Sequence, residues 1–343
     1  MNHSPSAMNK TLSLILQYAI FLGLGLFLIW WSVRSLSPED ITQLKDSLGR
    51  ARYVMVLPAM VLLLLSHYSR ALRWRILMEP LGFQPSRTNT FFSVMLGYFF
   101  NLLVPRMGEV MKCTMLAKYE KTPVDKLIGT MVAERALDLI CLLITIGVTF
   151  LLQTELIGSV LGEQLKGLDL SLHAPGRLLS LTMTFLAVIA VIAGIVLLLR
   201  RFGHISIVGK LRKLSLGIWD GLSSIRYIRQ KAAFAGHTVF IWAMYLLSVR
   251  LGFYAMDPVS HLGMEPSLSI LSVGSIAMIV TQGGIGAYQL AVQKVLGLYG
   301  ISAVNGLAYG WLLWAFQTIL VLVIGLLCLM LLPAVNRTKH ESI

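Results

Sequence analysis

Long apolar segments separated by short polar ones recur along the whole chain. Segments of about 20 apolar residues have the length that a helix needs to cross a lipid bilayer. The pattern therefore predicts an all-α polytopic membrane protein with about six transmembrane spans. We expect these spans at residues 12–33, 53–65, 127–152, 177–199, 233–256 and 303–332.

Two further apolar segments, residues 90–120 and residues 267–299, are interrupted by proline and glycine. These residues end one helix and allow another to begin. Backbone freed at membrane depth is tolerated only where it is buried in protein or lines a cavity. We therefore expect two re-entrant hairpins rather than two further spans. Their predicted backbone hinges are Pro105, Gly108, Gly283, Gly284 and Gly286.

The order span, span, hairpin, span occurs twice along the chain, and the second copy has the opposite orientation. This predicts one transmembrane domain, residues 1–343, built as an inverted repeat with two opposed re-entrant hairpins. The halves are residues 1–152 and 177–332. Between them, the basic connector 200–232 has helical apolar spacing, which predicts an amphipathic helix on the membrane surface or on the protein's own cytosolic side. If each hairpin crosses the bilayer fully, the number of spans rises toward about eight or ten.

Composition and charge support the membrane assignment. The 343 residues are 56% hydrophobic and 13% charged, with a formal net charge of +13. The basic residues collect in loops, which favours contact with anionic lipid head groups over binding of nucleic acid. Their distribution predicts cytoplasmic N- and C-termini, and residues 34–52 as a short loop on the outer side. The three cysteines have no metal-binding spacing and predict no disulfide framework.

Ionisable residues within apolar segments are costly, so they are the first candidates for a functional site. Glu109 follows the first break, where its carboxylate could hold a cationic head group, exchange a proton or cap the next helix. Arg106 could hold a lipid phosphate or pair with Glu109. Lys112 shares a face with Glu109 and could simply extend toward the membrane surface.

A second group of candidates lies on the spans beside the first hairpin. Glu134, Arg135 and Asp138 fall on one helical face, where they could line a cavity or form a structural ion network. We favour the structural role for Arg135 and Asp138. The end of the second span carries three more basic residues on one face, which we expect to be interface anchors with a possible role in guiding phosphates. These are His67, Arg70 and Arg73.

The second hairpin offers polar rather than charged candidates. Gln282, Tyr288 and Gln289 adjoin its glycines and could donate hydrogen bonds to a substrate, although core packing is the favoured role for Tyr288. The glycines are not a phosphate-binding loop, because the preceding strand and the lysine of that motif are absent. We expect no metal site and no cofactor.

Four motifs in order resemble the lysylphosphatidylglycerol synthase transmembrane family, the flippase-like membrane domain of the bacterial lysyl-phosphatidylglycerol synthase/flippase. They are Arg70-Ala71-Leu72-Arg73-Trp74-Arg75, Pro105-Arg106-Met107-Gly108-Glu109, Glu134-Arg135 with Asp138, and Gly283-Gly284-Ile285-Gly286-Ala287. The resemblance covers nearly the whole chain. It departs from the family where many members have proline in place of Gln282 and glutamate in place of Gln289.

The resemblance implies a protein of the bacterial inner membrane that moves a lipid between leaflets. Membrane phospholipids with anionic or zwitterionic head groups are the expected partners, and an oligomer is compatible with the sequence. We expect no enzyme activity, and no synthesis of lysyl-phosphatidylglycerol, because no aminoacyl-transferase domain follows. Two alternatives stay open: a transporter of a small soluble ion or solute, and a membrane-embedded transferase acting on a lipid carrier.

Overall fold

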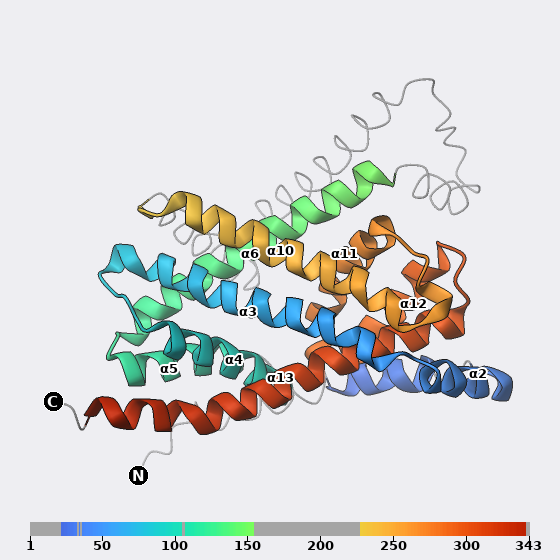
Figure 1. Cartoon of the computed structure of the whole chain (residues 1–343), viewed down its shortest axis with the longest axis horizontal. Coiled ribbons are helices and arrows are strands. Elements are labelled where there is room, and N and C mark those ends of the chain that lie inside the picture. Colours follow the sequence, from blue (N-terminus) through green and yellow to red (C-terminus); the bar gives the residue numbers. More distant parts are fainter. Residues whose placement is uncertain (1–21, 33, 35, 105–106, 154–226, 341–343) are drawn as a thin grey trace, which may run out of the picture.

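The computed structural model describes residues 22–153, except 33, 35, 105 and 106, and residues 227–340 (Figure 1). All regular secondary structure in these residues is helical. A short apolar helix, Leu22–Ser32, comes first. The labelled helices are α2 (Pro38–Gly49), α3 (Val56–Met78), α4 (Arg87–Leu103), α5 (Met107–Glu120), α6 (Val124–Leu152), α10 (Lys231–Gly252), α11 (Met264–Val280), α12 (Ala287–Gly297) and α13 (Ala303–His340).

Four helical segments of the described part are long and apolar enough to cross a membrane. They are Tyr53–Leu81, Val124–Leu152, Lys231–Ala255 and Ala303–Asn336. Each overlaps one of the spans expected from hydropathy, which confirms an all-helical protein with several candidate spans. The predicted total of about six stays a prediction, because the expected span 177–199 and most of the connector 200–232 lie outside the described residues. The same holds for residues 12–21 of the expected first span, of which the short helix Leu22–Ser32 is the described part.

Residues 34–52, expected to be a short loop, instead contain the helix α2. Ser37 begins this helix with a reciprocal capping box: its hydroxyl accepts from the Asp40 backbone N–H, and the Asp40 carboxylate accepts from the Ser37 N–H. Pro38 occupies the first turn, where its missing N–H costs nothing. No α2 residue is buried. Local capping therefore explains a helix that the hydropathy pattern did not reveal.

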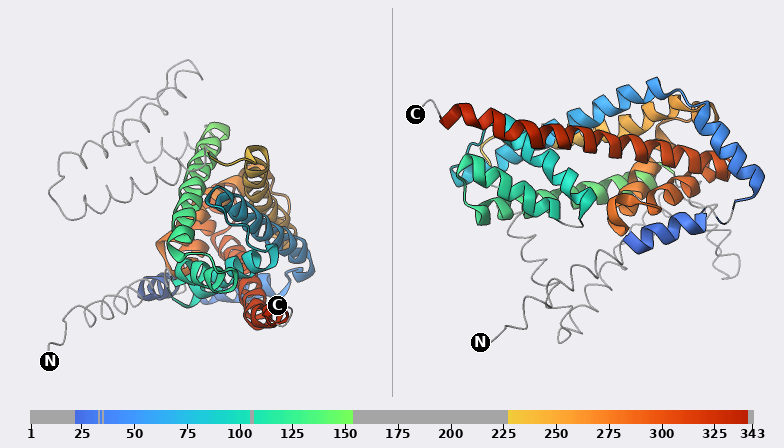
Figure 2. Two further views of the ribbon diagram at one scale, coloured as in Figure 1. Left: turned by 90° about the vertical axis from the view of Figure 1, so that its left-hand side faces the viewer. Right: turned by 90° about the horizontal axis from the view of Figure 1, so that it is seen from below.

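The helices form two groups of similar make-up, packed around an antiparallel pair. α3 and α10 lie side by side, and the start of α3 meets the end of α10 where the Arg52 N–H donates to the Ala255 carbonyl. The α4–α5 hairpin lies at one end of this pair and the α11–α12 hairpin at the other (Figures 1 and 2). Two long helices complete the bundle, since α6 packs on α5 and α11, and α13 packs on α4 and α12.

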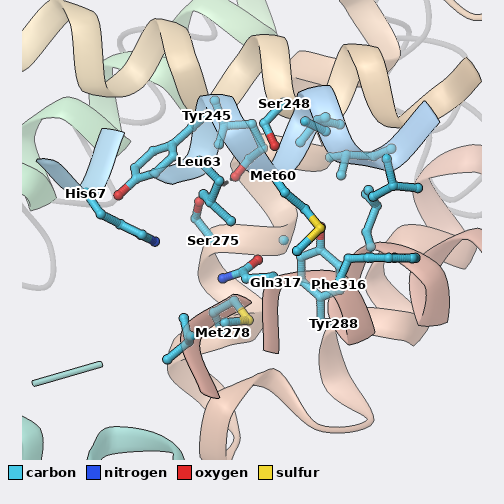
Figure 3. A pocket seen from close by; sticks show the side chains of 18 of the residues that line it. Met60, Leu63, His67, Tyr245, Ser248, Ser275, Met278, Tyr288, Phe316 and Gln317 are labelled. Carbon is cyan, nitrogen blue, oxygen red and sulfur yellow. Dashed lines mark hydrogen bonds between the residues drawn. The ribbon is translucent and has the colours of Figure 1, made fainter. Parts of the chain in front are cut away.

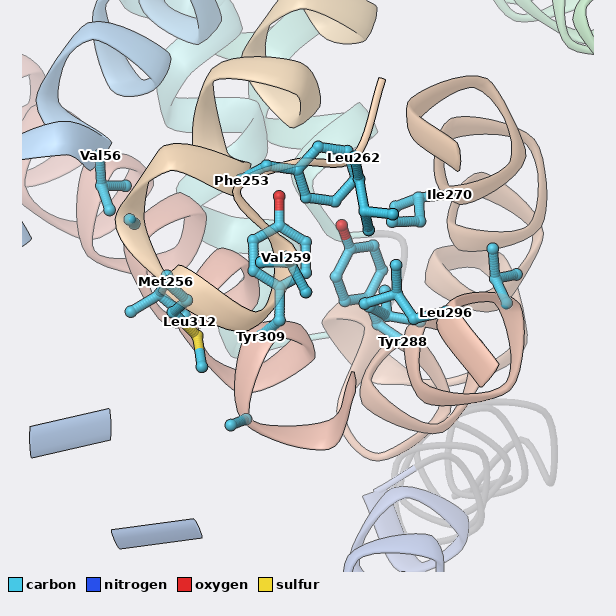
Figure 4. Close-up of a cluster of buried hydrophobic side chains, with 14 of the residues drawn as sticks. Val56, Phe253, Met256, Val259, Leu262, Ile270, Tyr288, Leu296, Tyr309 and Leu312 are labelled. Carbon is cyan, nitrogen blue, oxygen red and sulfur yellow. The ribbon is translucent and has the colours of Figure 1, made fainter. Parts of the chain in front are cut away.

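Each hairpin has its own apolar core. One core surrounds Trp74 and joins α3, α4, α5 and α6. The other is shown in Figure 4, where Phe253 stacks on Tyr309 with 5.0 Å between ring centroids, next to Tyr288. Burial of these aromatic rings and of the aliphatic side chains around them stabilises both ends of the molecule. Each core holds its hairpin against the long helices.

The outer surface of the long helices is strongly apolar. Side chains such as Ile144 and Leu152 of α6, and Met330 of α13, are more than half exposed. A soluble monomer rarely exposes so much contiguous apolar surface. The surface of α6 and α13 therefore has the character of a lipid-facing surface, in agreement with the candidate spans.

Candidate functional site

A buried network of five charged side chains joins three helices. Arg70 and Arg73 of α3 face Glu134 and Asp138 of α6, and Lys112 of α5 completes the group. Arg70 Nη1 lies 3.0 Å from Glu134 Oε1 and also pairs with Asp138. Arg73 Nη2 is 2.7 Å from Asp138 Oδ1, and Lys112 Nζ is 2.5 Å from Glu134 Oε2. Five of the predicted site residues are thus in direct contact.

Helical spacing brings these groups together. Arg70 and Arg73 are three residues apart, and Glu134 and Asp138 are four apart, so each pair lies on one face of its helix. The Glu134 side chain is 0% exposed, and the Lys112 side chain is 4% exposed. Three cations meet two carboxylates, which leaves one positive charge in surplus. Such a group is costly to bury, so each charge depends on its partners.

The expectation that His67, Arg70 and Arg73 are interface anchors was wrong, because all three side chains are buried. Arg70 and Arg73 are buried between helices rather than anchored at the membrane surface, because the carboxylates of α6 face them. Lys112 does not extend to the surface, because Glu134 holds its ammonium group inside the protein.

The structural role favoured for Asp138 agrees with its contacts, and Glu134, whose role was left open, belongs to the same network. The structural role favoured for Arg135 does not agree, because Arg135 forms no salt bridge with the described residues.

Neutral residues extend the network toward neighbouring elements. The Lys112 ammonium lies 4.0 Å from the ring centroid of Trp74, whose indole N–H donates to Thr130 at 2.9 Å. On the other side, Arg70 donates to the Tyr245 hydroxyl of α10 at 3.2 Å. The network therefore touches α10 as well as the three helices that carry its charges.

Glu109 and Arg135 stand apart from these ion pairs. Among the described residues, neither belongs to a salt bridge. Both line a small cavity of about 10 Å³ between α4, α5 and α6, together with Lys112, Tyr98 and Asn101. That volume has room for roughly one water molecule. The Glu109 carboxylate and the Arg135 guanidinium thus line the same cavity beside the first hairpin. Arg106 lies outside the described residues.

The two arms of the first hairpin are in backbone contact. A Cβ on Gly108 would overlap the carbonyl oxygen of Gly97 and lie 2.6 Å from Asn101 Cγ, so only glycine fits there. The side-chain oxygen of Asn101 accepts from the Gly108 N–H at 2.8 Å, which caps the start of α5. The predicted hinge at Gly108 is therefore a point of closest approach, while Pro105 lies outside the described residues.

The break of the second hairpin reaches the end of the first. Gly283, Gly284 and Gly286 have φ angles of 58°, 75° and 76°, which confirms the expected backbone turn. Gln282 Nε2 donates to the Asn101 carbonyl at 2.6 Å, so the amide of one break satisfies the backbone of the other. The contact gives a physical reason for glutamine at position 282, because a proline there would have no hydrogen-bond donor for the Asn101 carbonyl.

A larger cavity of about 260 Å³ lies between the hairpins, bounded by α3, α4, α10, α11, α12 and α13 (Figure 3). His67 and Tyr288, two predicted site residues, line this cavity. Tyr98 lines both cavities, and its ring lies 4.6 Å from that of His67. Sequence reasoning missed the other polar lining residues, which are single polar positions in apolar helices: Tyr98, Tyr245, Ser248, Ser275 and Gln317.

Gln289 is not part of either cavity's lining. It is 1% exposed, and both atoms of its side-chain amide lack a hydrogen-bond partner in the described residues. Its backbone packs closely on Gly310 of α13. Within the described ranges, no group of histidine, cysteine, aspartate and glutamate has the arrangement of a metal site.

Comparison with known proteins agrees with the resemblance found in the sequence. Residues 14–325 match the family model described as the lysylphosphatidylglycerol synthase TM region. A UPF0104 membrane protein of Methanocaldococcus jannaschii is 33% identical over 86 residues, which cover 24% of this chain and 26% of that relative. The match thus spans about a quarter of the relative's length. No solved structure matches the chain.

Proposed function

The chain belongs to the family of the lysylphosphatidylglycerol synthase TM region, and we propose that it moves a phospholipid or lipid carrier with a charged head group between membrane leaflets. The observation that carries the proposal is the pair of opposite charges, Glu109 and Arg135, in one cavity beside the hairpin break. Neither charge is used in an ion pair with the described residues. A zwitterionic or anionic head group offers the complementary charges.

The roles of the charged residues follow from their contacts. The planar guanidinium of Arg135 suits a phosphate, and the Glu109 carboxylate suits the amine of a zwitterionic lipid. The five-residue network holds α3, α5 and α6 together behind this pair, and its surplus positive charge favours an anionic phosphate nearby. Acyl chains stay in the bilayer, in contact with the apolar surface of the long helices.

Entry of a head group requires movement of the first hairpin. The cavity of about 10 Å³ is too small for a phosphate, and the Gly97–Gly108 contact holds α4 against α5. We infer that α4 and α5 form a re-entrant hairpin opposed by α11 and α12, in an inverted repeat that opens the site alternately to the two faces. The antiparallel α3–α10 pair, with one hairpin at each of its ends, supports this arrangement.

The orientation of the chain is proposed from its basic residues. The end of the bundle that carries the α3–α4 and α5–α6 connections is rich in lysine and arginine, including Arg87, Lys121 and Lys126. The opposite end carries Asp257 and Glu265 at the α10–α11 connection. Because basic loops stay inside, we place the first end and the C-terminus in the cytoplasm of a bacterial cell.

The test is leaflet exchange of fluorescent phospholipids in proteoliposomes. We expect the wild type to exchange phosphatidylcholine and phosphatidylglycerol faster than protein-free liposomes. Arg135→Gln should slow both lipids, whereas Glu109→Gln should slow the zwitterionic lipid more. Matched controls are Arg87→Gln and Glu265→Gln, which remove exposed charges outside the cavity.

The result that would overturn the proposal is a folded wild type that exchanges no lipid of either charge. Equal slowing by the controls would show that Glu109 and Arg135 have no special role. Uptake of a soluble ion or solute without any exchange of lipid would favour a solute transporter instead.

A further inference from the structure

The central cavity differs in chemistry from the charged cavity beside the first hairpin. None of its lining side chains is an aspartate, glutamate, lysine or arginine. Arg70, which donates a hydrogen bond to the lining residue Tyr245, is already paired with Glu134 and Asp138. An ion placed in the central cavity would lose its hydration without gaining a counter-charge, which is costly. The lining therefore selects against a charged group.

The cavity nevertheless presents unused hydrogen-bonding groups. His67 is 4% exposed, and both of its ring nitrogens lack a partner in the described residues. A neutral imidazole supplies one donor and one acceptor. Ser248 and Gln317 likewise make no side-chain hydrogen bond within the described part, and Ser275 uses its hydroxyl proton on the Leu271 carbonyl, which leaves its oxygen as an acceptor. Figure 3 shows His67, Ser275 and Gln317 reaching into the same space from α3, α11 and α13.

The rest of the wall is aromatic and aliphatic. Rings of Tyr98, Tyr245, Tyr288 and Phe316 line the cavity. Flat rings beside neutral donors and acceptors suit a sugar, whose C–H faces pack on aromatic surfaces while its hydroxyls exchange hydrogen bonds at the edge. The volume of about 260 Å³ lies just under the roughly 300–1,000 Å³ of pockets for drug-sized ligands. It matches one sugar ring or a short polyol.

We propose that the central cavity is a binding site for an uncharged, hydroxyl-rich group, either the sugar or polyol head of a lipid or a free sugar. His67 and Gln317 donate to and accept from its hydroxyls, and the aromatic rings hold its apolar faces. The proposal concerns binding only, so it can hold whether or not the protein moves lipid between leaflets.

The test is a calorimetric titration of the purified full chain in phosphatidylcholine nanodiscs. Glucoside and maltoside detergents are avoided because they carry the ligand's own chemistry. The probes are dihexanoyl monoglucosylglycerol, free glucose, and dihexanoylglycerol, which lacks the sugar. A lipid source predicts that the glucosyl lipid binds at least tenfold more tightly than either of the others, whereas a soluble source predicts comparable binding of free glucose.

Two variants and two matched controls assign the binding to this cavity. His67→Phe and Gln317→Leu remove the polar groups with little change in volume, and each should weaken binding about tenfold. His237→Phe and Gln293→Leu make the same replacements at residues that do not line the cavity, and they should bind as the wild type does. Unfolding temperatures of all four variants identify any that fail to fold.

The proposal is overturned by either of two results. One is that neither glucose nor the glucosyl lipid binds better than dihexanoylglycerol, which would make the cavity a space for water alone. The other is that His67→Phe and Gln317→Leu, when folded, bind the sugar probe as tightly as their controls do.

Discussion

Removing the charge of Glu134 should strongly destabilise the protein. Its carboxylate contacts Lys112 at 2.5 Å and Arg70 at 3.0 Å, and the side chain is 0% exposed. In Glu134→Gln the side chain keeps its shape and one acceptor oxygen, but its NH₂ group then faces a buried cation. Breaking one partner of a buried ion pair costs about 3–5 kcal/mol. We expect a loss of that size in the free energy of unfolding.

A second replacement should recover most of this loss. In Lys112→Met combined with Glu134→Leu, a cation and a carboxylate leave together. Two arginines and Asp138 remain, so the surplus of one positive charge is unchanged. Replacing a buried pair with apolar side chains of similar volume is often neutral or stabilising. The double variant should therefore be more stable than Glu134→Gln, even though Arg70 loses one contact.

Reversible unfolding in mixed micelles, by titration with sodium dodecyl sulfate, measures these differences. Asp125→Asn, an exposed carboxylate on the same helix, is the control and should change little. A hydrogen bond between membrane helices is worth about 0.6 kcal/mol on average. A loss of only that size in Glu134→Gln would refute the view that its charge compensates buried cations. A double variant as unstable as the sum of its single variants would refute the coupling of Lys112 to Glu134.

Two further predictions concern the first hairpin and the orientation of the chain. Gly108→Ala should separate α4 from α5 and lower the unfolding temperature, because the added Cβ would overlap the Gly97 carbonyl. The control Gly129→Ala has nothing within 4 Å of its Cβ and should be neutral or stabilising. Equal unfolding temperatures of the two variants would contradict the Gly97–Gly108 contact. In a cysteine-free variant, Lys121→Cys should react with a membrane-impermeant maleimide only from the cytoplasmic side, and Asp257→Cys should react only from the outer side. The reverse labelling pattern would overturn the proposed orientation.

The long helices were predictable because hydropathy over about 20 residues is a strong signal. The helix α2 was not found by hydropathy, yet Ser37-Pro38-Glu39-Asp40 carries the sequence signature of a capping box. Reading that local signature would have corrected the expected loop.

The site was predictable in part. Charged residues in apolar helices marked the network, and helical spacing grouped Glu134 with Asp138. Their pairing with Arg70 and Arg73 joins residues more than 60 positions apart, which periodicity within one helix cannot specify. Burial of the arginines was missed for the same reason, since the position of α6 against α3 is a property of the packed bundle.

For the central cavity, the sequence pointed to His67 and Tyr288 alone and gave no signal for the other polar lining residues. Ser248, Ser275 and Gln317 are isolated polar residues in three apolar helices, and such residues more often bond to their own backbone. Ser275 does so through its hydroxyl proton. Only the packed arrangement shows that all three line the same space as His67.

The meeting of the two hairpin breaks has a consequence for the energy that the proposed opening of the site would need. In the described part of the chain, the side-chain hydrogen bonds that join the breaks run from Gln282 to the carbonyls of Asn101 and Leu102. Interhelical hydrogen bonds in membranes contribute about 0.6 kcal/mol, and at most about 1.7, while a tenfold change in population corresponds to about 1.4 kcal/mol. Separating the two breaks at this contact is thus within reach of thermal motion. Exchange between the closed and parted arrangements needs neither nucleotide hydrolysis nor an ion gradient to break this contact.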